Sequence, residues 1–285
     1  MKESLGEYRA RDRSPLSFRK WTGSGDVIVY LHGLESNSGW FSPFAAELNK
    51  KGFTLYGIDR RGTGLNKEGS RGDIADYNIF LDDIEDTLSF IKNQNTGKKI
   101  FLMGICWGGL LAVNYAIKKR AMPDGLILLS PAIYRKIDFN IFVKTIAKFC
   151  YFISPQIRFN IPIRDRMFTS NTRYLDFIKK DKMRLRRLTC RFFNEILKME
   201  NELSGINYKI ALPVLVLLAG EDGIVDNKKI KDWFRKLVSV DKTIKIFDDF
   251  YHVMPFEDNS NSLINFIGEW AKAREASLEC KSVSN

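Results

Sequence analysis

Residues 100–109, with the sequence IFLMGICWGG, decide the fold of this chain. The first four are apolar and predict a buried strand, while the residues after the last glycine, Leu110 to Lys119, follow a helical pattern. Gly104 and Gly108 flank Cys106, as expected for a turn in which backbone segments approach too closely for side chains. The stretch therefore predicts a strand, a sharp turn and a helix, with Cys106 presented at the corner in a strained conformation.

A cysteine at such a corner can act as a nucleophile. The helix that begins there brings its N-terminus and the amide of Trp107 to a position where they stabilise negative charge on a thiolate or on a substrate oxyanion. A free cysteine can also be a small buried hydrophobic residue in a glycine-rich turn. The strand on one side of Cys106 and the helix on the other favour the nucleophile.

Apolar runs alternate with helical patterns along the whole chain. The runs that predict strands are Val27–Leu31, Phe53–Ile58, Ile100–Ile105, Leu126–Leu129, Val214–Leu218 and Ile244–Phe247. The predicted helices between and after them are Phe44–Lys50, Ile79–Asn93, Leu110–Lys119, Ile230–Leu237 and Leu263–Ala273. This alternation is typical of an α/β fold with a mostly parallel central sheet flanked by helices. Gly6–Arg11 and Leu16–Trp21 are expected to add an antiparallel pair at the edge of the sheet.

The alternation stops between about residues 133 and 212. We predict a helical cap, or lid, at residues 133–206, inserted after the sixth strand into a core formed by residues 1–132 and 207–285. Two sets of apolar residues in this interval have helical spacing: Phe139, Phe142, Val143, Ile146, Phe149 and Ile153, and then Leu185, Leu188, Phe192, Ile196 and Met199. These stripes either pack the cap onto the core or line a pocket for an acyl chain.

A nucleophilic cysteine needs a base, and the chain contains only two histidines, His32 and His252. His252 follows the last short strand and is assigned as the general base, with a surface loop histidine as the alternative. His32 and Gly33 follow the first long strand, where a loop amide can complete an oxyanion hole, so we assign His32 a structural role.

The acid that orients the base should follow a strand between the nucleophile and the base in the sequence. Asp222 lies in the turn after Val214–Leu218, and it would hold the imidazole tautomer and stabilise the imidazolium. Glu221 and Asp226 are nearby competitors, and a solvated turn acid is the plain alternative.

These segments resemble the monoacylglycerol lipase and lysophospholipase branch, serine aminopeptidase S33-like, of the α/β-hydrolase superfamily, over nearly the whole chain. The motifs that carry the resemblance are LHGL at 31–34, DRRGTG at 59–64, the turn around Cys106, SPA at 130–132, and GEDGIVD at 220–226 followed by His252. The resemblance implies that the amide of Leu34 joins the oxyanion hole and that the cap encloses a lipid-like acyl group. This sequence departs from the family pattern at Cys106, where the family usually has a serine nucleophile.

We therefore expect hydrolysis of a lipophilic carboxylic ester or thioester through a Cys106–His252–Asp222 triad and a covalent acyl-enzyme, without a metal or organic cofactor. A thioester intermediate also reacts well with amines and thiols, so an acyltransferase, cyclase or thioesterase acting on carrier-bound acyl groups is the alternative. A non-catalytic ligand-binding protein with the same fold is a third possibility.

The net charge of +11 points to an anionic partner. Residues 134–206 contain 16 Lys and Arg against 7 Asp and Glu, an excess of nine, with Arg184, Arg186, Arg187 and Arg191 expected on one helix. An anionic membrane surface or an acidic carrier protein fits an acyl substrate, whereas no nucleic-acid-binding motif accompanies the charge. The four cysteines show no C-x-x-C spacing, so neither a zinc site nor a disulfide framework is expected. No apolar run is long enough for a membrane span. We therefore expect a cytoplasmic protein, either free or bound peripherally to a membrane.

Overall fold

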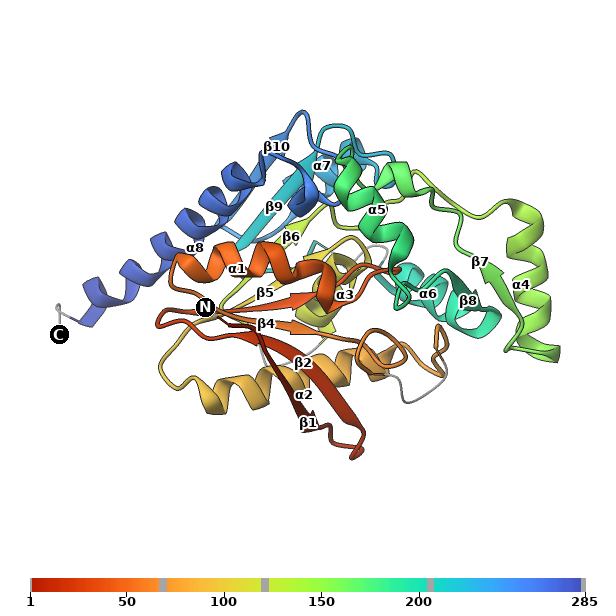
Figure 1. The fold of residues 1–285 in the computed structure, drawn as a ribbon, viewed down its shortest axis with the longest axis horizontal. Helices are drawn as coiled ribbons and strands as arrows, with labels where there is room; N and C mark the ends of the chain where they lie inside the picture. The colour runs from red at the N-terminus through yellow and green to blue at the C-terminus, as the bar shows by residue number, and fades with distance from the viewer. Residues whose placement is uncertain (1, 67–70, 119–122, 204–207, 283–285) are drawn as a thin grey trace.

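The computed structural model describes residues 2–66, 71–118, 123–203 and 208–282, and the side chains as far as Arg274. One eight-stranded sheet forms its centre, in the order β1-β2-β4-β3-β5-β6-β9-β10 (Figure 1). The strands are β1 (Ser4–Arg9), β2 (Pro15–Trp21), β3 (Val27–Leu31), β4 (Thr54–Ile58), β5 (Ile100–Ile105), β6 (Gly125–Leu129), β9 (Val214–Ala219) and β10 (Lys242–Phe247). All neighbours from β4 to β10 pair in parallel, whereas β1 and β2 form an antiparallel pair at one edge. The predicted mostly parallel sheet is confirmed.

Helices cover both faces of this sheet. They are α1 (Ser42–Lys50), α2 (Asn78–Gln94), α3 (Trp107–Lys118), α7 (Asn227–Lys236) and α8 (Ser260–Ser282), with short 3-10 helices at η1 (Ser38–Phe41) and η3 (Met254–Phe256). Helix α1 packs against α8, and α2 packs against α3. Strands β3, β4, β5, β6 and β9 are therefore buried along their whole length, which explains why their sequences are continuously apolar rather than alternating.

The interval between β6 and β9, which we call the inserted segment, is richer in structure than predicted. It contains α4 (Ile141–Ile153), β7 (Arg158–Asn160), η2 (Asp165–Met167), α5 (Thr172–Lys180), β8 (Arg187–Thr189) and α6 (Cys190–Leu203). Strands β7 and β8 form a separate two-stranded sheet. The predicted domain boundary at residues 206 and 207 lies outside the described residues, so the division into core and cap stays a prediction.

The first predicted apolar stripe packs differently from either expectation. On α4, Phe142, Ile146, Phe149 and Ile153 are exposed, with exposed fractions between 58% and 75%. Of this stripe, Val143 and Phe139, which precedes the helix, belong to a small second core. Ala147 and Cys150 of α4 pack against α6 in the same core. A helix has two faces, and the spacing alone did not show that the larger apolar face of α4 is turned outward.

The second stripe and the arginine cluster were each predicted on one helix, and both predictions are wrong. Leu185 and Leu188 precede α6, which begins at Cys190. Arg184 and Arg186 lie in the loop after α5, Arg187 is in β8, and Arg191 is in α6. The short strand β8 interrupts the apparent helical periodicity by pairing with β7. Local spacing does not reveal such a contact between distant residues.

None of the helices in the described ranges is both long enough and apolar enough to cross a lipid bilayer.

Candidate active site

Cys106 stands at the corner between β5 and α3, in a left-handed backbone conformation with φ of +54°. Its amide donates to the carbonyl of Leu129 at 3.0 Å, and its carbonyl accepts from Gly109 and Leu110 in the first turn of α3. A side chain on Gly104 would overlap the backbone of Gly108, and one on Gly108 would overlap the carbonyl of Leu31. The two glycines are thus required by close backbone approach.

His252 lies in the loop between β10 and η3, and Asp222 lies in the turn after β9. Nδ1 of His252 is 2.8 Å from Oδ2 of Asp222. The other carboxylate oxygen of Asp222 accepts from the amides of Ile224 at 2.8 Å and Val225 at 3.0 Å. Both side chains are fully buried, so the pair is held in one orientation.

The pKa values of the two groups move apart. Burial alone would raise the pKa of Asp222, but the charge of His252 and the hydrogen bonds that the carboxylate accepts hold it below its usual range. Burial alone would lower the pKa of His252, but the negative charge of Asp222 and the hydrogen bond to its carboxylate raise it well above its usual value. Asp222 therefore stabilises the imidazolium that forms when His252 accepts a proton.

The two other candidates for the acid that orients His252 do not contact its ring. Glu221 is exposed, and Asp226 caps α7 by accepting from the amide of Lys229. Of the three candidates, only Asp222 is hydrogen-bonded to His252.

His32 is fully buried behind the loop that follows β3. Its Nδ1 is 2.8 Å from the carbonyl of Gly33, and its Nε2 is 3.1 Å from the hydroxyl of Thr63. Burial, aided by the charge of Arg60, lowers the pKa of His32 well below its usual value, so the ring is neutral. These contacts fit the structural role expected for His32.

Arg60 is the residue that the sequence did not mark for this loop. Its guanidinium donates to the carbonyls of His32 at 2.7 Å, Gly33 at 3.1 Å and Leu34 at 3.0 Å. It also lies over the ring of Trp107, 4.8 Å from the centroid. One buried cation therefore fixes three successive carbonyls, and with them the orientation of the Leu34 amide.

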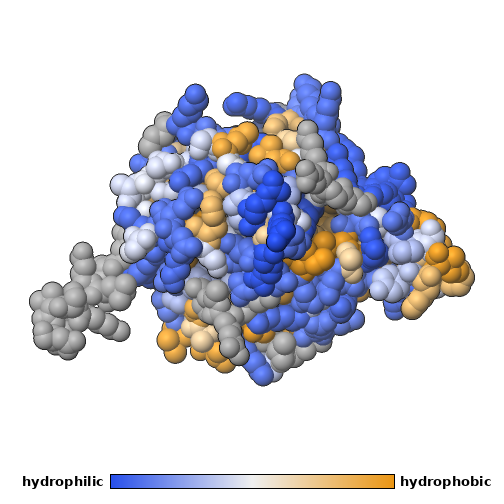
Figure 2. Space-filling view, turned by 90° about the horizontal axis from the view of Figure 1, so that it is seen from below, coloured by the Kyte–Doolittle hydropathy of each residue, from blue (hydrophilic) through white to orange (hydrophobic). Residues whose placement is uncertain are grey.

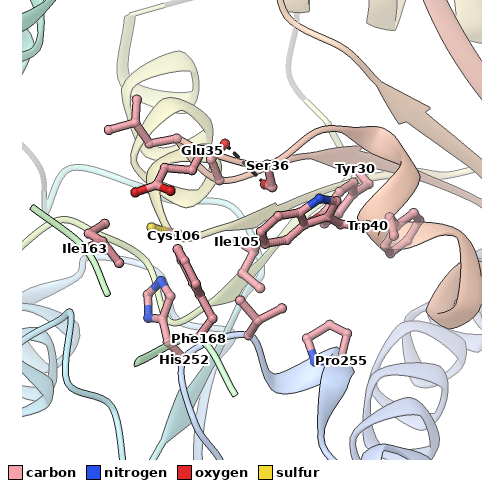
Figure 3. Close-up of a pocket in the computed structure, with 14 residues that line it drawn as sticks. Tyr30, Glu35, Ser36, Trp40, Ile105, Cys106, Ile163, Phe168, His252 and Pro255 are labelled. Atoms are coloured by element: carbon pink, nitrogen blue, oxygen red, sulfur yellow. Dashed lines mark hydrogen bonds between the residues drawn. The ribbon is translucent and has the colours of Figure 1, made fainter. Parts of the chain in front are cut away.

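A pocket with an empty volume of about 470 Å³ opens beside Cys106 and His252 (Figure 3). Its other walls are mostly apolar: Tyr30, Leu34, Trp40, Phe41, Ile105, Ile163, Phe168, Val253 and Pro255. Among the described residues of the inserted segment, only Ile163 and Phe168 line it, and both lie outside the two predicted stripes. The interpretation of those stripes as the wall of an acyl pocket is therefore wrong for this pocket.

The sequence also missed the pairing of Glu35 with Arg184. Glu35 lines the pocket, and its carboxylate is joined to Arg184 of the inserted segment at 2.6 Å. The two residues are 149 positions apart, so no local pattern could have paired them. Among the residues that the structure describes, no group of three or more His, Cys, Asp or Glu side chains is placed to hold a metal ion.

A mostly parallel sheet with a strained corner at Cys106 after β5 and a buried acid–histidine pair beyond β9 and β10 is the arrangement of an α/β-hydrolase. The family model described as serine aminopeptidase, S33, matches residues 24–259, and the chain belongs to this family.

Similar proteins extend the comparison. Monoglyceride lipase from Homo sapiens is 25% identical over 272 residues, which are 93% of this chain and 89% of the lipase. An uncharacterized abhydrolase domain-containing protein from Dictyostelium discoideum is 24% identical over 290 residues, which cover all of this chain. This chain spans 30% of the length of that protein. The fold is similar to that of a soluble variant of monoglyceride lipase from Saccharomyces cerevisiae in complex with a substrate analog, with a TM-score of 0.83 and 21% identity over 96% of this chain and 95% of that one.

Proposed function

We propose that the chain hydrolyses a lipophilic carboxylic ester or thioester with Cys106 as the nucleophile. The sulfur attacks the acyl carbon while His252 takes the thiol proton, and the amides of Leu34 and Trp107 hold the oxyanion. Collapse of the tetrahedral intermediate releases the alcohol or thiol, which takes its proton from His252. Water then cleaves the acyl-cysteine thioester with His252 as the base, and the free acid and free thiol are restored.

One observation supports this proposal above the others. His252 is anchored through Nδ1 to Asp222, whereas its Nε2 is buried without a hydrogen-bond partner among the described residues. His252 and Cys106 line the same apolar pocket (Figure 3). A histidine fixed on one nitrogen and available on the other is the arrangement that general base catalysis needs.

The similarity to monoglyceride lipases supports a lipid-like ester as the substrate. The apolar walls of the pocket agree with a hydrocarbon acyl chain, because burial of each methylene group contributes roughly 0.8 kcal/mol.

The nucleophile is tested with p-nitrophenyl decanoate, rapid acid quenching and intact-mass spectrometry. The wild-type protein should gain one decanoyl group and release p-nitrophenol, and Cys106→Ala should do neither. Cys150→Ala is the matched control, because Cys150 is a half-buried free cysteine outside the pocket. An adduct that persists in Cys106→Ala, or a wild-type protein that releases no p-nitrophenol, would contradict the proposal, and the latter result favours a ligand-binding protein.

Hydrolysis and transfer are separated with a decanoyl thioester offered alone and with amine, alcohol or thiol acceptors. Decanoic acid as the only product in every mixture supports hydrolysis. A decanoyl amide, ester or exchanged thioester as the main product would favour an acyltransferase.

The same proposal includes an anionic lipid surface as the partner of α4. Its outer face carries large apolar side chains with exposed fractions from 58% to 84%: Ile141, Phe142, Ile146, Phe149, Phe152 and Ile153. Figure 2 shows hydrophobic side chains gathered at the end of the molecule where Figure 1 places α4, beyond the carboxyl ends of the strands that carry the site.

Charge complementarity favours lipid over a second copy of this basic chain. The inserted segment that carries this apolar face also has exposed cations: Lys148, Arg164, Arg166, Arg173, Lys179, Lys180, Lys182, Arg186 and Arg187. Apolar side chains that enter a lipid layer and cations that contact anionic headgroups add their contributions to binding. Arg184 and Arg191 do not belong to this surface, because they form ion pairs with Glu35 and Asp73.

A further inference from the structure

Residues 165–185 of the inserted segment, which we call the brace, contact both loops of the candidate active site. The brace contains η2 and α5, and Figure 1 shows α5 between the ends of the central strands and α4. One end of the brace is hydrogen-bonded to the loop that follows β3, and the other end to the loop that follows β10. Unlike the exposed outer face of α4, the brace is therefore tied to the sheet on two sides.

Asp181, at the carboxyl end of α5, holds the loop that carries the candidate oxyanion amide. Its Oδ2 accepts from Nδ2 of Asn37 at 2.8 Å and from Nε1 of Trp40 at 2.7 Å. Asn37 in turn caps η1, because its Oδ1 accepts from the amide of Gly39 at 2.9 Å. Leu34 and Asn37 lie on one short loop between β3 and η1, so the carboxylate of Asp181 limits the movement of that loop.

Two further contacts join the brace to the same loop, at Glu35. Nε of Arg184 donates to Oε2 of Glu35 at 2.7 Å, and the amide of Leu185 donates to the carbonyl of Glu35 at 2.8 Å. Burial raises the pKa of Glu35 to about 7, against the opposing charges of Arg184 and Arg186. The hydrogen bond from Leu185 does not depend on the charge of the carboxyl group, so the loop stays attached in either protonation state.

The other end of the brace holds the loop that carries His252. The carbonyl of Phe168 accepts from the amide of Val253, the residue after His252, at 2.7 Å. The buried carboxylate of Glu257, just beyond η3, accepts from the hydroxyl of Thr169 at 2.6 Å. These contacts attach the brace on both sides of η3.

Aromatic side chains connect the two ends of the brace through Trp40. Its ring meets Phe168 edge to face, with ring centroids 5.8 Å apart, and Phe177 at 6.1 Å. It also lies 5.7 Å from the ring of Phe256 in η3, which stacks on Tyr174 of α5. Closely packed side chains transmit a displacement. The brace therefore fixes the loop after β3 relative to the loop after β10.

We propose that Asp181 is a positioning residue for hydrolysis, which through the brace keeps the amide of Leu34 in place relative to His252. The inference rests on the proposed hydrolase function and adds a residue of the inserted segment to it. Asp181 does not line the pocket, so it acts through Asn37 and Trp40 and not on the substrate. Donors to an oxyanion must be placed within about 0.5 Å, so a small displacement of the loop slows the reaction.

The test compares two ketones of similar shape as inhibitors of p-nitrophenyl decanoate hydrolysis. Nonyl trifluoromethyl ketone forms a hemithioketal with a reactive thiol, and its oxygen then occupies the oxyanion hole. Nonyl methyl ketone enters the same pocket without forming an appreciable adduct. Asp181→Ala should raise the inhibition constant of the trifluoromethyl ketone by about 10-fold or more and that of the methyl ketone by less than about twofold. An inhibition constant does not depend on the concentration of folded protein, so a variant that folds only in part still reports it.

Two variants are the controls for Asp181→Ala. Asp181→Asn retains an oxygen that can accept from Asn37 and Trp40, so its inhibition constant for the trifluoromethyl ketone should lie closer to the wild-type value. Asp176→Ala removes an exposed acid of the same helix and should leave both inhibition constants within about twofold of the wild type.

Glu257→Ala tests the other end of the brace. Releasing either end frees one loop from the other, so a second release adds little. The double variant with Asp181→Ala should therefore raise the inhibition constant of the trifluoromethyl ketone by less than the product of the two single effects. Single effects that multiply fully would show two independent supports and would overturn the positioning of Leu34 relative to His252 by the brace.

An unchanged inhibition constant in Asp181→Ala, or equal increases for the two ketones, would overturn the role of Asp181 while leaving ester hydrolysis intact. If the wild type does not hydrolyse p-nitrophenyl decanoate, the proposed function fails and this inference fails with it.

Discussion

Nδ1 of His252 lies 2.8 Å from Oδ2 of Asp222, with both side chains fully buried and 30 positions apart in the sequence. The carboxylate of Asp222 also accepts hydrogen bonds from two backbone amides, so it cannot rotate away from the imidazole without losing these hydrogen bonds. The relationship between these two residues leads to separate expectations for activity and for stability.

Asp222→Asn should lower kcat for p-nitrophenyl decanoate by about 100-fold or more, because an amide neither fixes the productive tautomer nor stabilises the imidazolium. Glu221→Gln is the matched control, since Glu221 is the neighbouring acid but is exposed, and it should retain wild-type kcat within about twofold. Equal losses in the two variants would contradict the assignment of Asp222.

The stability of the wild type relative to Asp222→Asn should depend on pH. The pKa of His252 is raised above 6.5 in the folded state, so its stabilisation is complete below that pH and is lost as the pH rises through the folded value. The pKa of Asp222 is lowered below 3.8, so its contribution is present above that pH and is lost as the pH falls. The difference in unfolding free energy should therefore be largest between about pH 4 and 6.5 and should shrink by about 1 kcal/mol or more toward pH 9. Urea unfolding at several pH values measures it, and a difference that grows above pH 7 would contradict the sign.

Gly108→Ala should destabilise the protein by about 2 kcal/mol or more, because the new methyl group would overlap the carbonyl of Leu31. Gly268→Ala is the control: Gly268 lies within α8, and its new methyl would lie 3.0 Å from the flexible Lys51 side chain and at an ordinary contact distance of 3.7 Å from the Phe53 ring. That change should be neutral or stabilising by up to about 1 kcal/mol. Equal unfolding midpoints for the two variants would show that the corner after β5 tolerates a side chain.

Replacing Phe142, Phe149 and Phe152 together by serine should lower the partition coefficient onto vesicles that contain phosphatidylserine by about 100-fold. The melting temperature should change little, because these side chains are 66–84% exposed. Val240→Ser is the control, as Val240 is fully exposed outside the inserted segment, and it should change partitioning by less than about twofold. Unchanged sedimentation of the triple variant would contradict docking through α4, and equal wild-type binding to neutral vesicles would contradict the part assigned to the cations.

The sequence determined the local chemistry and the layered fold. Continuous apolar runs identified strands buried on both faces, and glycines around Cys106 identified the sharp corner, because these signals depend on neighbouring residues and on backbone sterics. With two histidines in the chain, the sequence also limited the candidates for a base to His32 and His252.

Only the tertiary structure decided which face of α4 is turned outward, that β8 interrupts the predicted second helix by pairing with β7, and that Arg184 is a buried partner of Glu35 rather than a surface cation. Each of these depends on contacts between residues far apart in the chain. Helical spacing shows that a face is apolar but not what covers it, and charge composition shows that a cation is present but not whether a distant carboxylate neutralises it.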